Sequence, residues 1–174
     1  MTAPRNRLSR DRILQAARAI AAKEGLSAVS MRRLGYELEV WPMSLYRHFR
    51  DKDELLDAIV DSAAEEIAAP PRGSWRARLG RLLTDTRAML GEDPEGLRTR
   101  FPGALETDGM VRLTGTGVSI LEEAGLDADE AACAWRALFG YTFGVAGLGE
   151  DDAEFEHGLS LMLDGLEARL GVTA

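Results

Sequence analysis

The chain has 174 residues, of which 45% are hydrophobic and 29% charged, and its formal net charge is −8. This composition supports a packed core and excludes a disordered chain, and no run of about 18 apolar residues is present that could form a membrane-spanning helix. The basic stretch 1–12 lacks a following apolar segment, and Cys133 is the one cysteine, so we expect no secretory signal, no internal disulfide and a cytoplasmic location.

Helical spacing of apolar residues extends through almost the whole chain without strand alternation, so the expected fold class is all-α. The first helix is predicted to begin after Ser9, a favoured N-cap residue, and to end at Gly25. A short second helix should follow Ser30. The third should begin at Pro42, which suits a first helical turn, and run to about Phe49.

Asp51, with Glu54 three residues later, resembles a capping box and predicts the start of a longer helix. Pro70 and Pro71 should break that helix. The remaining helices are expected, in chain order, after Ser74, from Asp93 to Phe101, from Thr107 to Ala124, from Ala131 to Leu148, and from a turn at 149–152 to Leu170.

The three short helices before residue 50, two of them separated by a tight turn at 39–41, describe a helix-turn-helix. Leu34 and Leu38 of one helix and Leu45 and Phe49 of the next have the spacing of buried contacts. The other residues of the third helix then form a polar, aromatic and basic outer surface that fits a major groove. They are Met43, Ser44, Tyr46, Arg47 and His48.

The charge is divided unevenly between two predicted domains. Residues 1–52, the helix-turn-helix domain, hold 11 Lys and Arg against 5 Asp and Glu, which gives +6. Residues 53–174, a helical ligand-binding and dimerisation domain, hold 10 against 24, which gives −14. A polyanion would be attracted to the first domain and repelled by the second. Accidental asymmetry is the alternative, and the helix-turn-helix motif favours the DNA-binding interpretation.

The stretch Leu8–Val60 resembles the DNA-binding domain of the tetracycline-repressor (TetR) family. The specific part is SLYRHFRDKDELL, Ser44–Leu56, together with EGL and VSMRRL ahead of it. SWRARL at 74–79, WRALFGYTFG at 135–144 and HGLSLMLDGLEARL at 157–170 resemble the C-terminal domain of tetracycline repressors more weakly. The resemblance implies a homodimeric repressor that binds a palindromic double-stranded DNA operator and leaves it when a small-molecule effector binds.

Two positions depart from the family pattern. The family usually has glycine where this chain has Glu39, so Glu39 is expected to adopt a positive φ at a modest cost in energy. It usually has alanine where this chain has Gly35, which leaves room for close packing but lowers helix propensity.

The resemblance implies two sets of DNA-contacting residues. Base-edge or groove contacts are expected from Met31, Arg32, Trp41, Pro42, Met43 and Tyr46, and phosphate contacts from Ser44, Tyr46, His48 and Lys52. Independently of the resemblance, the basic outer surface of the third helix predicts a phosphate contact from Arg47 as well. Arg32 is the expected base reader, because a guanidinium can bind O6 and N7 of guanine together. The alternatives are a solvated surface charge for Arg32 and a core position for Tyr46.

The second domain is expected to supply a dimer interface and a ligand cavity. The dimer residues are small or apolar at helical spacing, and packing within one protomer is the alternative: Ala137, Gly140, Gly144, Gly147, Phe155, Leu159, Met162 and Leu166. The cavity residues, for which ordinary core packing is the alternative, are Leu82, Thr86, Thr99, Arg100, Phe101, Thr114, Gly117, Val118, Arg136 and Phe139.

Enzyme, metal and cofactor sites are not expected. Cys133 has the sequence context of a small core residue, and residues 115–117 lack the rest of a phosphate-binding loop. The resemblance places Gly96 where tetracycline repressors carry a metal-binding histidine, so a magnesium–tetracycline ligand is not expected. The alternative function is a helical small-molecule binding or catalytic protein whose DNA-binding head is non-functional, which Gly35 and Glu39 would favour.

Overall fold

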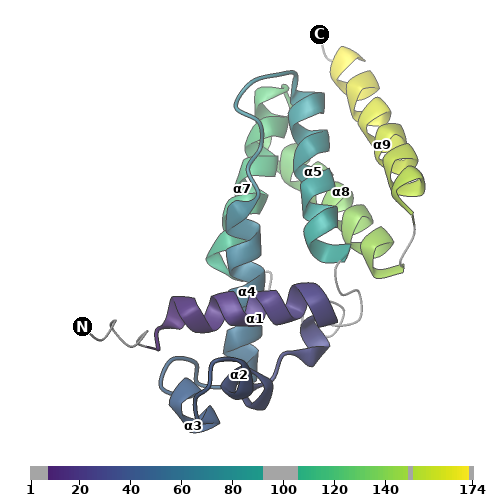
Figure 1. Ribbon diagram of the computed structural model, residues 1–174. Helices are drawn as coiled ribbons and strands as arrows, with labels where there is room; N and C mark the ends of the chain where they lie inside the picture. The colour runs from purple at the N-terminus through teal and green to yellow at the C-terminus, as the bar shows by residue number, and fades with distance from the viewer. Residues whose placement is uncertain (1–7, 92–105, 149–150, 173–174) are drawn as a thin grey trace.

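The computed structural model describes residues 8–91, 106–148 and 151–172, and all regular structure in these ranges is helical. The described helices form two units joined by the long helix α4 (Lys52–Glu66), as Figure 1 shows. We call α1 (Arg10–Glu24), η1 (Leu26–Ala28), α2 (Met31–Glu37) and α3 (Pro42–Leu45) the head. The helices that follow α4 are called the body.

The predicted caps at the start of the head helices are confirmed. The Oγ atoms of Ser9 and Ser30 each accept a hydrogen bond from the backbone N–H three residues later, at 3.2 and 3.1 Å. Asp51 Oδ1 accepts one from the Glu54 N–H at 2.8 Å, whereas Glu54 Oε2 accepts from the N–H of Arg50 at 2.7 Å. These side chains satisfy backbone donors that a helix start leaves open.

The head has its own hydrophobic core, built from α1, α2, the α3 region and the first half of α4. Leu34, Leu38, Leu45 and Phe49 are all buried there, as their spacing predicts. The predicted length of the third helix is wrong, because α3 ends at Leu45 and a turn follows. The Phe49 N–H still donates to the Leu45 carbonyl at 3.1 Å, which keeps the Phe49 ring directed into the core.

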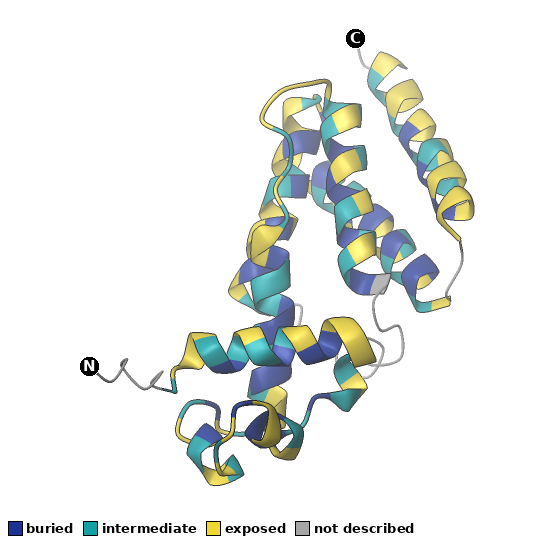
Figure 2. Cartoon of the chain, in the orientation of Figure 1, coloured by how far each residue is buried: buried dark blue, intermediate teal, exposed yellow. Residues whose placement is uncertain are grey.

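Helix α4 takes part in both cores. Leu55, Leu56 and Ile59 pack with the head, and Val60 and Ala64 pack with the body. Figure 2 shows the buried side of α4 continuing along the helix from one unit to the other. Any movement of the head relative to the body therefore involves this helix.

The body contains α5 (Trp75–Gly91), α7 (Asp108–Glu123), α8 (Ala128–Leu148) and α9 (Asp152–Val172). Helices α5, α7 and α8 pack against one another, α4 packs on α7, and α9 lies along the outside against α8 (Figure 1). Helix α8 begins three residues earlier than predicted. Asp127 caps it, because its Oδ1 accepts a hydrogen bond from the Glu130 N–H at 2.9 Å. The helix predicted at 93–101 lies outside the described residues.

Candidate nucleic-acid interface

The turn between α2 and α3 accommodates both departures from the family pattern. Glu39 has φ 55°, the positive value predicted for it. A Cβ atom on Gly35 would lie 2.9 Å from the Val40 carbonyl oxygen and 3.1 Å from Pro42 Cγ. Gly35 therefore lets the chain after the turn approach α2 closely, and the Val40 N–H donates to the Gly35 carbonyl at 2.9 Å. Neither residue disrupts the helix-turn-helix.

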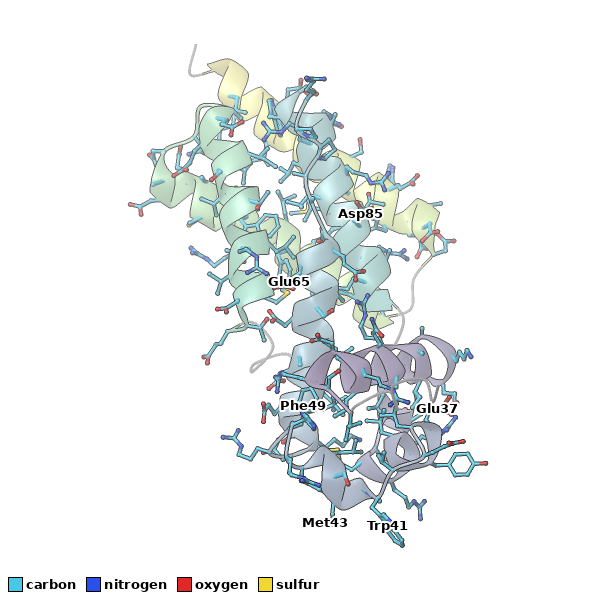
Figure 3. All side chains as sticks on the ribbon, turned by 60° about the vertical axis from the view of Figure 1, so that its left-hand side comes forward. Glu37, Trp41, Met43, Phe49, Glu65 and Asp85 are labelled. Carbon is cyan, nitrogen blue, oxygen red and sulfur yellow. The ribbon has the colours of Figure 1, made fainter. Side chains whose placement is uncertain are left out.

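The end of the head exposes large apolar side chains. Trp41 is 83% exposed and Met43 is 74% exposed, and Tyr46 is exposed beside them. Figure 3 shows Trp41 and Met43 at the far end of the head, on the side away from α1. We call this surface the tip. Exposed apolar side chains gathered at one place on a small domain are typical of an interaction site.

Exposed cations in the helix-turn-helix and at the start of α4 have no acidic partner in the described residues. Arg32, Arg47 and Lys52 are exposed, and none of them forms an ion pair with a carboxylate in the described part of the chain. Their neighbour Arg33 differs, because it pairs with Glu24 at 3.1 Å and with Glu37 at 2.8 Å. These carboxylates, Glu24 foremost, raise the pKa of Arg33. Arg32 is thus available to an external acceptor and Arg33 is not.

Arg10 fixes the segment that follows α3. Its Nη1 donates to the His48 carbonyl at 2.8 Å and to Glu54 Oε1 at 2.9 Å, and its guanidinium lies 4.1 Å from the centroid of the Phe49 ring. Hydrogen bonds from the Arg50 N–H and then from Arg10 hold the pKa of the Glu54 carboxyl below its usual value. The charged Glu54 therefore joins the start of α1 to the segment that leads from α3 into α4.

Two residues of α2 differ in exposure from what the predicted contacts imply. Met31 is only 6% exposed and packs in the head core, so its predicted groove contact is wrong. Pro42, Ser44 and His48 are half-buried at the edge of the tip. Tyr36, which the sequence did not single out, is 82% exposed and lines a surface hollow together with Arg32 and Trp41. Its position four residues after Arg32, on the same face of α2, was the available signal.

Of the seven described residues that were predicted to line a cavity in the body, four are buried in its packing. Leu82 and Phe139 are buried in the core, and the buried Thr86 hydroxyl donates to the Leu82 carbonyl at 2.7 Å. A Cβ atom on Gly117 would lie 2.1 Å from the Trp135 ring, so this indole occupies the space beside Gly117.

The other predicted cavity residues are scattered. Thr114 and Arg136 are exposed, and Val118 is half-buried at the edge of the core. The predicted Thr99, Arg100 and Phe101 lie outside the described residues.

The predicted dimer residues fall into two groups. Ala137, Gly140 and Gly144 form an exposed stripe on α8, and a Cβ atom on either glycine would meet nothing within 4 Å. Phe155 and Leu159 are buried in the core of their own protomer, where the Phe155 ring stacks on Tyr141 at 5.9 Å, so their assignment to a partner's surface is wrong.

Three further interface predictions, Gly147, Met162 and Leu166, are half-buried. On α9 the exposed face instead presents Leu161, which is 59% exposed, and Gly165 one turn later. A Cβ atom on Gly165 would also meet nothing within 4 Å.

Cys133 is exposed on α8, contrary to the predicted core position, and Arg136 Nη2 donates to its Sγ at 3.0 Å. Within the described ranges, no group of three or more His, Cys, Asp or Glu side chains is arranged to hold a metal ion. No helix in those ranges is both long and apolar enough to cross a bilayer.

The chain resembles known regulators over most of its length. Residues 13–59 match the model of the bacterial regulatory proteins of the tetR family. The chain is 34% identical over 166 residues to the HTH-type transcriptional repressor DrrR1 of Streptomyces coeruleorubidus, with 90% of this chain and 60% of the relative covered. It spans about 60% of the length of the first curated relatives it matches.

Solved structures give the same result. BioQ in complex with its double-stranded DNA operator superposes with a TM-score of 0.80 at 26% identity, covering 93% of this chain and 99% of that one. The TetR family protein ActR of Streptomyces coelicolor, in complex with (S)-DNPA, gives a TM-score of 0.76 at 25% identity, with 97% and 100% covered.

The intact helix-turn-helix, its exposed tip and the all-helical body place this chain among the helix-turn-helix proteins. Together with the family match and the similarity to DrrR1 and BioQ, they show that the chain belongs to the TetR family of bacterial regulatory proteins.

Proposed function

We propose that this chain is a homodimeric, ligand-responsive transcriptional repressor that binds a palindromic DNA operator through its head. The observation that carries the proposal is the tip, where Trp41 and Met43 are exposed and Arg32, Arg47 and Lys52 stand without acidic partners in the described residues. Exposed cations that form no ion pair with a carboxylate of the described chain are available to phosphates and to guanine edges. The proposal assigns no catalytic reaction, metal or cofactor to the chain.

Within the tip, the proposed roles follow from exposure and residue type. Arg32 reads a base through its guanidinium, and Trp41 and Met43 contact thymine methyl groups. Tyr46, Arg47 and Lys52 meet phosphates, together with Ser44 and His48 at the edge of the tip. The proposed domain division, 1–52 and 53–174, places all of these residues on the DNA-binding side.

The proposed dimer uses the exposed stripes of α8 and α9. Gly140, Gly144 and Gly165 leave open space above the helix backbones, and Ala137 and Leu161 lie on the same exposed faces. Small residues in a stripe allow another helix to approach closely, and a two-fold dimer presents two heads to two half-sites of one operator. The similarity to BioQ, which was solved with its double-stranded DNA operator, supports the DNA-binding part of the proposal.

The test is a gel shift with the promoter region nearest to the gene that encodes this chain. The proposal predicts a complex of two protomers per DNA fragment that survives an excess of unrelated duplex. A regulator should form a complex that unrelated duplex does not compete away and that a small molecule releases. A small-molecule binding protein with a non-functional head should form no such complex. No shifted complex at low salt would contradict the proposed function.

A further inference from the structure

A pocket of about 620 Å³ lies where the head meets the body, apart from the tip and from the residues predicted to line a body cavity. Helix α1 contributes Ala19 and Ala22, α4 contributes Ala63, and α5 contributes Asp85 and Met89. Ile67, directly after α4, also lines the pocket. Asp85 is labelled on α5 in Figure 3, with α1 below it. Helix α4 packs against both α1 and α5, and the three helices line the pocket, which is half-open to solvent where Ala19 and Ala22 are exposed.

The walls of this pocket are mostly small and apolar. The alanines have no side-chain atoms beyond Cβ, so they leave volume between the helices, while Ile67 and Met89 add apolar surface. A volume of this size falls within the range of about 300–1,000 Å³ that is typical of small-molecule sites. The pocket is thus large enough for a ligand of several rings.

The charged groups of the pocket are already paired with one another. Arg18 Nη2 donates to Glu66 Oε2 at 2.8 Å, and Arg18 Nη1 donates to Ser62 Oγ at 3.0 Å. Arg81 Nε donates to Asp85 Oδ2 at 2.8 Å. The two cations and two anions give the pocket no net charge, so electrostatics do not favour a charged ligand over a neutral one. A neutral ligand can accept or donate hydrogen bonds at the edges of these pairs.

We propose that this pocket binds a neutral, largely apolar organic molecule with one or two hydrogen-bonding groups, and that its occupancy couples the head to the body. A bound molecule contacts α1 in the head and α5 in the body at the same time, so its affinity depends on how the two units are placed. By thermodynamic reciprocity, operator and ligand then change each other's affinity by the same factor. This regulatory part rests on the proposed function, whereas ligand binding does not.

The binding part is tested with Nile red, a neutral apolar dye whose fluorescence rises in apolar surroundings. Ala22→Trp fills the pocket from α1 and Ala63→Leu fills it from α4. Ala88→Trp, at an exposed position of α5 outside the pocket, is the matched control. We expect saturable binding to the wild type and to Ala88→Trp, and about tenfold weaker binding to each filled variant, as expected when bulk occupies a site.

Far-UV circular dichroism checks that each variant is folded, and the milder Ala63→Leu decides the result if Ala22→Trp is not. Equal dye affinity in all four proteins, or no saturable binding to the wild type, overturns the site. Operator affinity is then measured with and without saturating dye, and a shift in the wild type that Ala63→Leu lacks supports the coupling. An unchanged operator affinity overturns it. Loss of operator binding without dye would contradict the proposed function alone, because the dye titration uses DNA-free protein.

Discussion

Arginine serves different purposes in the head tip and in the body. In the body Arg76, Arg78, Arg87 and Arg112 each pair with a carboxylate on another helix, and most of these pairs join helices far apart in the sequence. At the tip Arg32 and Arg47 pair with no carboxylate of the described chain. The same side chain therefore ties helices together in one region and remains available to a partner in the other.

Two faces of the body use glycine differently. Gly117 makes room for the ring of Trp135 and so allows tight packing of α7 on α8. On the outer face of α8, Gly140 and Gly144 have open space where a Cβ would be. The first glycine is needed for packing inside the protomer, whereas the other two leave room that the proposed dimer partner would fill.

The largest expected effect is on the body. Gly117→Ala places a methyl group 2.1 Å from the Trp135 ring and should lower the free energy of unfolding by about 3 kcal/mol through overpacking. Gly115→Ala, two residues earlier on the same helix and with nothing within 4 Å, should instead raise it by about 0.5–1 kcal/mol through helix propensity. Urea unfolding of both variants measures the difference. Similar effects at the two positions would refute the packing of Trp135 on Gly117.

The next largest effect is the difference in operator affinity between Arg32→Ala and Arg33→Ala. Arg32→Ala should weaken operator binding by about 2 kcal/mol and relax the preference at one position in each half-site. Arg33→Ala removes a cation that is already paired with Glu24 and Glu37, so its effect on operator affinity should stay within about 0.5 kcal/mol. The measurement is a fluorescence-anisotropy titration of labelled operator. Equal losses would mean that pairing inside the protein does not decide which arginine reads DNA.

Gly144→Leu tests the open face of α8. The added side chain meets nothing in the protomer, so its cost should come from the partner, and the dimer should weaken by about 1–2 kcal/mol. Gly115→Leu, equally open but outside the stripe, is the control. Light scattering at a series of concentrations gives the dimer dissociation constant. A wild-type monomer at micromolar concentration would remove the proposed interface altogether.

Lys52→Ala should produce a smaller and more uniform change. Loss of one phosphate contact should weaken binding to all sequences and reduce the slope of log affinity against log salt by about one unit per head. Lys23→Ala, at the last turn of α1, should leave that slope unchanged. The comparison is a salt titration of both variants. An unchanged slope and affinity for Lys52→Ala would exclude Lys52 from the phosphate contacts.

The smallest expected effect concerns the Arg18–Glu66 pair beside the pocket. Arg18 holds the pKa of the exposed Glu66 carboxyl below its usual value, so the pair adds stability above about pH 4.3 and loses it as the pH falls through the lower folded pKa. Glu66→Gln and Arg18→Gln should each reduce the drop in stability between pH 5 and pH 3. Thermal melts at pH 5 and pH 3 measure this loss of stability. A loss as large in both variants as in the wild type would show that the pair contributes nothing to the pH dependence.

Local signals in the sequence were sufficient for most of the head. Ser9, Ser30 and Asp51 cap the helices that they were predicted to cap, because a cap depends on residues within one turn. Glu39 adopts the predicted positive φ, but that prediction came from the resemblance, because the family usually has glycine at this position.

Long-range packing could not be derived in the same way. The Trp135 ring on α8 packs against Gly117 on α7, and the apolar periodicity of neither helix indicates that contact. Phe155 was assigned to a partner's surface because α9 has more apolar residues than one face needs, but the position of α8 decides which of them turn inward. Met31 is a similar case, because its burial depends on how α2 is rotated against α1.

The most direct test of the central claim is selection of bound duplexes from a random DNA library by the purified protein, in parallel with Arg32→Ala. The account predicts that the wild type enriches a palindromic sequence with two half-sites separated by about one or more helical turns. It also predicts that Arg32→Ala enriches the same palindrome with one position lost in each half. Enrichment of no sequence by the wild type would contradict the claim that the exposed tip reads DNA.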